Sequence, residues 1–145
     1  MRQKFLLLLA FFAVSPTVWS QQCTLGIGGP DTDLIIQVFM LDGQQQQKLH
    51  QWAEALEAEN APLEASARTL LETHPQSTQE ELAALGPKFE ALKETMVENA
   101  RKYDRLLLGT FNPGQYERYA DLCHEVNRQP MAPLPEDAGP DGPQH

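Results

Sequence analysis

The chain has 145 residues, of which 20 are acidic and 11 are Lys or Arg, so its formal net charge is −9. A length of this order fits a single domain. The excess of acid repels phosphate backbones and anionic lipid, and no basic stripe with interleaved aromatic residues occurs. The composition therefore argues against nucleic-acid binding, and no apolar run after the N-terminus is long enough for stable membrane insertion.

The first 20 residues have the pattern of a secretory signal peptide. A positively charged start precedes an unbroken apolar run at 5–14, and Val18-Trp19-Ser20 offers a cleavage site. The run is too short to span a bilayer, although an N-terminal membrane anchor is the alternative. We expect 1–20 to be removed and the protein to be periplasmic or secreted. Without Arg2 and Lys4, nine basic residues face 20 acidic ones, a net charge of −11.

Cys23 and Cys123 are the two cysteines of the chain. Export would place them in an oxidising compartment, where an even count favours a disulfide. They lie near the two ends of the expected folded part. Closing so long a loop stabilises a protein by about 4–5 kcal/mol on the chain-entropy model. Two buried or reactive thiols are the alternative.

The expected fold is all-α, with a helical domain at 31–129. Residues 21–30 are Gly-rich and predict a loop. Asp31 or Thr32 can cap a short N-terminal helix that is apolar nearly all round, so we expect it to be buried. Asp42 is a good N-cap for a long helix that runs to about Thr73.

Two apolar seams of helical period dominate the middle of the chain. On the first arm, leucines recur every seven residues, at Leu49, Leu56, Leu63 and Leu70. On the second arm, the steps are of three, four or seven, at Leu82, Leu85, Phe89, Leu92, Met96, Tyr103 and Leu106. The turn between them carries two candidate capping boxes, Ser77 with Glu80 and Thr78 with Glu81. These seams predict a long antiparallel helical hairpin whose second arm ends near Leu108 or Gly109.

A proline lies inside each arm, Pro62 on the first and Pro87 on the second. An interior proline removes a hydrogen bond and bends a helix. The leucine phase is unchanged across Pro62, so we predict kinks in continuous helices and not breaks. Counted from the turn, the two prolines differ in level by only about one helical turn. Two kinks at one level would curve the hairpin as a unit, and two independent local bends are the alternative.

A last helix should follow Asn112, which suits an N-cap, and Pro113, which suits the first helical position. We expect this C-terminal helix to run to about Arg128. Its apolar stripe consists of Tyr116, Tyr119, Cys123 and Val126. Residues 130–145 are rich in proline and glycine and predict a disordered tail. Two helices alone bury too little surface, so the other helices, the disulfide and possible homodimer formation would supply the rest.

Five-residue boxes open helices on both sides of the hairpin: Leu41-Asp42-Gly43-Gln44-Gln45 and Phe111-Asn112-Pro113-Gly114-Gln115. Each resembles the Leu-Thr-x-x-Gln box of the Spy/CpxP (LTXXQ) family of periplasmic helical proteins. Asp42 and Asn112 replace the threonine and Phe111 replaces the leucine, but each N-cap keeps a side-chain oxygen. The resemblance covers roughly 34–126. It implies small curved helical dimers that act as ATP-independent chaperones, sensor-kinase adaptors or metal-binding sensors. The chain departs from the family in its cysteine pair and its acidity, since the family's chaperone cradle is basic.

Motifs of catalysis are not evident, and we expect no enzyme and no cofactor. Gly26-Ile27-Gly28-Gly29 lacks the strand and the lysine of a phosphate loop. Glutamates lie between the apolar positions of the helices, as on solvated faces, at Glu54, Glu57, Glu59, Glu80, Glu81, Glu94 and Glu98.

The candidate metal ligands are His50, His74, His124 and His145 with the two cysteines. No His-x-x-x-His or Cys-x-x-Cys spacing occurs among them. Met40 and Met96 fit core stripes better than a copper site, and Trp52, Tyr116 and Tyr119 fit packing better than a ligand platform.

The hypothesis is a periplasmic Spy/CpxP-like chaperone or stress adaptor that binds unfolded or partner protein segments. A periplasmic metal-binding sensor or scavenger is the alternative, and a self-associating envelope scaffold is a third candidate.

Overall fold

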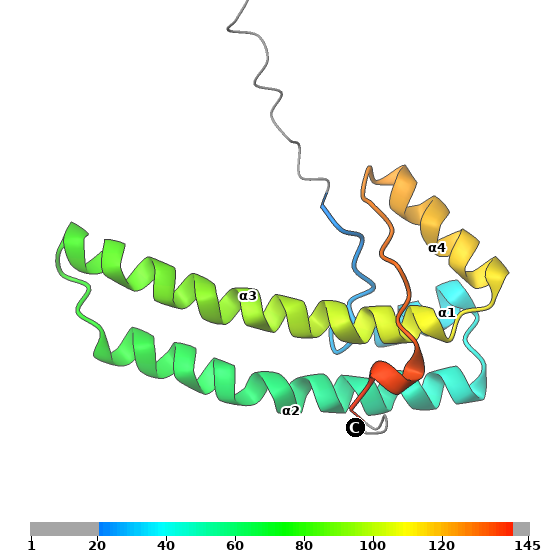
Figure 1. Ribbon diagram of the computed structural model, residues 1–145, viewed down its shortest axis with the longest axis horizontal. Coiled ribbons are helices and arrows are strands. Elements are labelled where there is room, and N and C mark those ends of the chain that lie inside the picture. The colour runs from blue at the N-terminus through cyan, green and yellow to red at the C-terminus, as the bar shows by residue number, and fades with distance from the viewer. Residues whose placement is uncertain (1–20, 141–145) are drawn as a thin grey trace, which may run out of the picture.

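The computed structural model describes residues 21–140, so the expected signal peptide and the last five residues lie outside the described range. This range is all-helical, as predicted. It contains α1 (Thr32–Phe39), α2 (Gly43–Thr73), α3 (Gln79–Gly109), α4 (Pro113–Glu125) and the short 3-10 helix η1 (Glu136–Ala138). α2 and α3 pack against each other along the hairpin, and α1 and α4 gather at the end away from its turn (Figure 1). We call that end the base.

The three longer helices each begin with a closed capping box. In each box the N-cap side chain accepts the backbone N–H of the third helical residue, whose own side chain accepts the N-cap N–H. The pairs are Asp42 with Gln45, Thr78 with Glu81, and Asn112 with Gln115. These short-range signals explain why α2, α3 and α4 begin at the residues that the sequence predicts.

Both arms are continuous through their prolines. α2 contains Pro62 and α3 contains Pro87 with no break in either helix. The unbroken leucine phase therefore correctly predicted that α2 continues through Pro62. Both arms bow in the same sense along their length (Figure 1).

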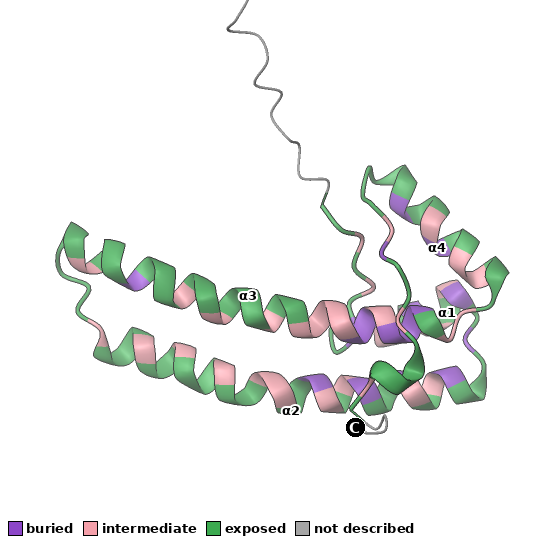
Figure 2. Ribbon diagram, viewed as in Figure 1, coloured by how far each residue is buried: buried purple, intermediate pink, exposed green. Residues whose placement is uncertain are grey.

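The core lies at the base, where all four α-helices meet. The buried apolar side chains of α2 and α3 there are Leu49, Trp52, Leu56, Tyr103, Leu106, Leu107 and Leu108. The Phe39 ring of α1 packs at a tilt against Phe111, with ring centroids 5.1 Å apart, and makes an edge-to-face contact with Tyr119 at 6.5 Å. A disulfide joins Cys23 to Cys123 beneath α4, which confirms the predicted pairing. In Figure 2 the buried residues concentrate at this end of the hairpin.

Residues 130–140 do not form the disordered tail that their composition predicts. Together with Gln129 they form a strap that crosses α3 and reaches α2 at η1 (Figure 1). Met131 is 3% exposed and its N–H donates to Tyr119 Oη at 2.9 Å, while the Leu134 N–H donates to the Arg105 carbonyl at 2.8 Å. Gly109 permits the close approach, because a Cβ there would lie 1.9 Å from the Leu134 carbonyl oxygen. One buried methionine and a few long-range hydrogen bonds thus order a segment whose composition gives no sign of it.

Three further expectations are wrong. α4 ends at Glu125 and not near Arg128, because Asn127 takes a left-handed conformation (φ 54°) and leaves Val126 60% exposed. α1 is buried on one face only, since Leu34 is 56% exposed. Met40 is no core residue: it caps α1 in a left-handed conformation and is 81% exposed.

Candidate functional site

The two cap boxes meet at the base through their glutamines. Gln45 Nε2 donates to Gln115 Oε1 at 2.8 Å, and Gln115 Nε2 donates to Gln45 Oε1 at 3.0 Å. Gln45 also donates to the Thr110 carbonyl, and Gln115 to the Phe39 carbonyl. All polar atoms of both amides are therefore bonded, with no donor or acceptor left for a ligand. Leu41 is buried and Phe111 half-buried beside them. The box residues thus fix the starts of α2 and α4 relative to each other.

Asp104 of α3 is a buried carboxylate that sequence reasoning missed. Its side chain accepts the backbone N–H groups of Leu25, Gly26 and Ile27 at 2.8, 3.3 and 3.0 Å. Gly26 takes a φ of 86°, which a residue with a side chain rarely adopts. Burial raises the pKa of Asp104 above its ordinary value, although the three N–H donors act to lower it. The Gly-rich loop therefore wraps this carboxylate and is no free linker.

A polar clasp ends the base. Glu59 of α2 accepts from Lys102 Nζ and from Tyr103 Oη of α3, each at 2.7 Å, and Asn99 Nδ2 donates to Asn60 Oδ1 at 3.0 Å. Burial acts to raise the pKa of Glu59, but the hydrogen bonds from Lys102 and Tyr103 outweigh it and lower that pKa. The spacing of Glu59 predicts a freely solvated side chain, and that prediction is wrong. The clasp instead ties the two arms together.

Beyond the clasp lie the distal arms, residues 61–73 of α2 and 79–97 of α3, where most of the apolar seam is no longer buried. Leu49 and Leu56 are buried at the base, but Leu63 and Leu70 of the same apolar seam are half-buried. On α3, Leu82 is 49% exposed. Leu85 is the one buried apolar residue of the distal arms. Figure 2 shows the change along the hairpin from buried to exposed.

An open apolar groove of about 390 Å³ runs along the distal arms between α2 and α3. Its floor is apolar and comes from both helices: Ala67, Leu71, Phe89 and Met96. Its margin carries both signs of charge, with Glu64, Arg68 and Lys93. Such a groove can bury apolar side chains of a partner and pair with charged groups beside them. Sequence periodicity identified Phe89 and Met96 but not the groove, because a seam that packs and a seam that stays open have the same spacing.

The candidate metal ligands within residues 21–140 do not converge. His50 and His124 are exposed on different helices, the His74 ring bonds to the neighbouring Pro75 carbonyl, and both cysteines are in the disulfide. Across residues 21–140, no three His, Cys, Asp or Glu side chains gather in a way that could hold a metal ion. His145 lies outside that range. In the same part of the chain, no helix is long and apolar enough to cross a membrane.

Comparison with protein families, with curated proteins and with solved structures gave no match. A functional inference therefore depends on the geometry of the base and of the distal arms.

Proposed function

We propose that this is an exported, ATP-independent binding protein that holds unfolded or partly unfolded segments of other proteins along its distal arms, as a Spy/CpxP-like chaperone or adaptor does. One observation carries the proposal. The apolar seam that is buried at the base continues into the distal arms, where no further layer of the described chain covers it.

Burial of exposed apolar area would supply the binding free energy. Leu71 and Leu82 are 44% and 49% exposed. Complete burial of such a side chain is worth about 1.5–3 kcal/mol, so covering two or three of them gives weak, reversible binding. A chaperone that holds unfolded clients needs weak, reversible binding, because the client must dissociate in order to fold. The clasp and the packed base keep the arms together while the groove is empty.

Bends at Pro62 and Pro87 are part of the proposal. If both helices bend in the same sense at these residues, the hairpin has a concave face along which an extended client can lie. The many exposed glutamates on the arms would keep the loaded complex soluble.

Suppression of aggregation tests the proposal. The mature protein, without ATP, should reduce light scattering from a denatured client at a near-stoichiometric ratio. Leu71→Gln/Met96→Gln should weaken this activity several-fold. Leu34→Gln is the matched control, because it changes an exposed leucine on α1 far along the chain from the groove. Circular dichroism should show unchanged helix content in both variants.

Two results would contradict the proposal. One is aggregation that is undiminished at an excess of protein. The other is a dimer in light scattering that Leu71→Gln/Met96→Gln dissociates while no client is held, which would make the groove a subunit interface.

A further inference from the structure

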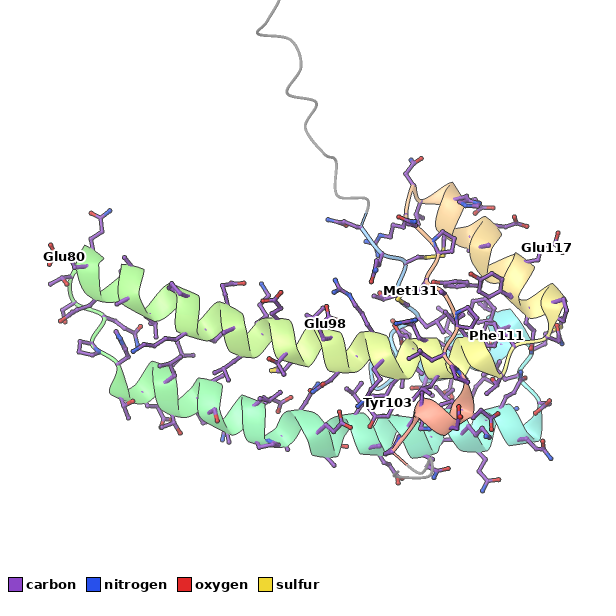
Figure 3. All side chains as sticks on the ribbon, viewed as in Figure 1. Glu80, Glu98, Tyr103, Phe111, Glu117 and Met131 are labelled. Carbon is purple, nitrogen blue, oxygen red and sulfur yellow. A yellow bond between two sulfur atoms is a disulfide. The ribbon has the colours of Figure 1, made fainter. Side chains whose placement is uncertain are left out.

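We propose that the protein has a second site, a cationic cleft at the base that binds a carboxylate-bearing organic anion. This cleft has a volume of about 580 Å³ and lies between α3 and the strap. α3 supplies the charged wall and the strap supplies an apolar one. The side chains that matter are Glu98, Arg101, Lys102, Arg105, Met131 and Leu134. Figure 3 shows Glu98 and Met131 on the same side of α3.

The charge of the cleft is opposite to that of the chain. Three of the nine Lys and Arg residues at 21–145 line it, and Glu98 is its one acidic lining residue, although the chain carries a net charge of −9. Lys102 Nζ already pairs with Glu59 of α2, so Arg101 and Arg105 are the cations that a ligand would meet. Arg101 and Arg105 are four residues apart on a helix, where like charges face each other and destabilise it. A bound anion would relieve that repulsion.

The protein holds these cations in place without using all their donors. Arg105 Nε donates to the Ala132 carbonyl of the strap at 2.8 Å, and no carboxylate of residues 21–140 pairs with it. Arg101 pairs with Glu98 through Nη1, but its Nε is buried and has no hydrogen-bond partner in the described chain. A guanidinium has five N–H donors, so both arginines have donors to spare. A carboxylate in the cleft would accept from the remaining Nη donors of the two arginines, whereas the buried Arg101 Nε is out of its reach in this conformation.

Size and shape define the class of ligand. Arginine forks match planar carboxylates in two parallel hydrogen bonds. Met131 and Leu134 offer apolar contact to a short carbon skeleton, and the volume is within the usual range for small-ligand sites. A free di- or tricarboxylate and the acidic side chains of a protein segment share this chemistry.

Glu98 acts as an internal competitor for Arg101. Its side chain is 61% exposed, so it can swing into solvent when a ligand carboxylate takes its place. Removing the charge of Glu98 should therefore tighten anion binding. A variant that merely unfolded the protein would weaken that binding instead.

Calorimetric titration of the mature protein with citrate at low ionic strength tests the proposal. Arg101→Gln/Arg105→Gln should weaken citrate binding at least tenfold, and Glu98→Gln should tighten it several-fold. Lys88→Gln/Lys93→Gln removes the same charge outside the cleft and should leave citrate affinity unchanged. Since Arg105 also ties the strap, Arg101→Gln alone is the second variant, and it should weaken binding several-fold with an unchanged melting temperature.

A parallel titration with an acetylated and amidated poly-glutamate peptide separates the two sources. Binding of citrate alone assigns a small carboxylate, and binding of the peptide assigns an acidic protein segment; either supports the site. The proposal is overturned if neither probe binds, or if the arginine variants bind as the wild type does. The distal groove takes no part in the citrate titration, so this result is independent of the chaperone proposal.

Discussion

Asp104 is the residue that holds the N-terminal segment in the fold. Its carboxylate is 1% exposed and accepts three consecutive backbone N–H groups of the Gly-rich loop. Leaving a buried donor unpaired costs about 1–3 kcal/mol, so replacement by alanine would expose the loop to several such penalties. The same loop carries Cys23, so the position of the disulfide depends on this carboxylate as well.

The raised pKa of Asp104 has a definite consequence for stability. A carboxyl group whose pKa is higher in the folded state stabilises the fold fully below its unfolded value of about 3.8, and this contribution is lost as pH rises through the folded pKa. Asp104→Asn does not titrate. The difference in unfolding free energy between wild type and Asp104→Asn, measured by urea denaturation from about pH 3 to about pH 7, should therefore shift against the wild type as pH rises. A difference that moves in favour of the wild type would show that the three N–H donors lower the pKa.

At the scale of elements, the Gln45–Gln115 amide pair couples the start of α2 to the start of α4. Each glutamine closes its own capping box and also bonds to the other. Helix starts that share hydrogen bonds should not respond independently to mutation.

A double-mutant cycle measures that coupling. Gln45→Ala and Gln115→Ala should each destabilise the protein, and the double variant should lose less than the sum, with a coupling energy of about 0.5–3 kcal/mol in chemical denaturation. Gln45→Ala combined with Glu81→Ala is the control, because Glu81 closes a separate box at the hairpin turn. That control pair should be additive. Additivity of the Gln45 and Gln115 variants would show that the two boxes act separately.

The helices themselves were predictable because their signals are local. Asp42, Thr78 and Asn112 each reach a residue three positions on, and the leucine phase on the two sides of Pro62 fixes one continuous helix. Apart from the disulfide, which the even cysteine count predicted, contacts between distant parts of the chain were not predictable. Asp104 meets a loop 77–79 residues away, and nothing in its spacing indicates that contact. The strap was not predicted, because a segment rich in proline and glycine has the composition of a disordered tail. The single methionine that anchors it, Met131, does not change that composition. The groove was not predicted either. Periodicity shows where an apolar seam lies on a helix but not which part of it other segments of the protein bury.

At the scale of the whole molecule, one disulfide closes a loop that contains α1, α2, α3 and most of α4. Cys23 and Cys123 are separated by 100 residues, and the loop between them contains the hairpin. Closing a loop of this length reduces the freedom of the unfolded chain by the equivalent of about 4–5 kcal/mol.

Removal of the disulfide should therefore lower stability without removing the hairpin. Cys23→Ser/Cys123→Ser should lose up to about 4–5 kcal/mol of unfolding free energy in urea, and wild type with reducing agent should match it. Far-UV circular dichroism at low urea should retain its helical signal, because neither the clasp nor the buried residues of α2 and α3 at the base include a cysteine. An unchanged midpoint would show that the chain-entropy term is offset by structure in the unfolded state.

The central claim about this molecule is that the packed base provides stability and the open distal arms bind clients. Hydrogen–deuterium exchange of a protein that comprises residues 21–145, with and without an excess of an unfolded client, tests it most directly. We predict slower exchange at 63–71 and 89–97, the segments that contain the groove, and unchanged exchange in α1, α4 and the strap. Protection confined to α1 and α4, or no protection at any segment, would contradict the claim.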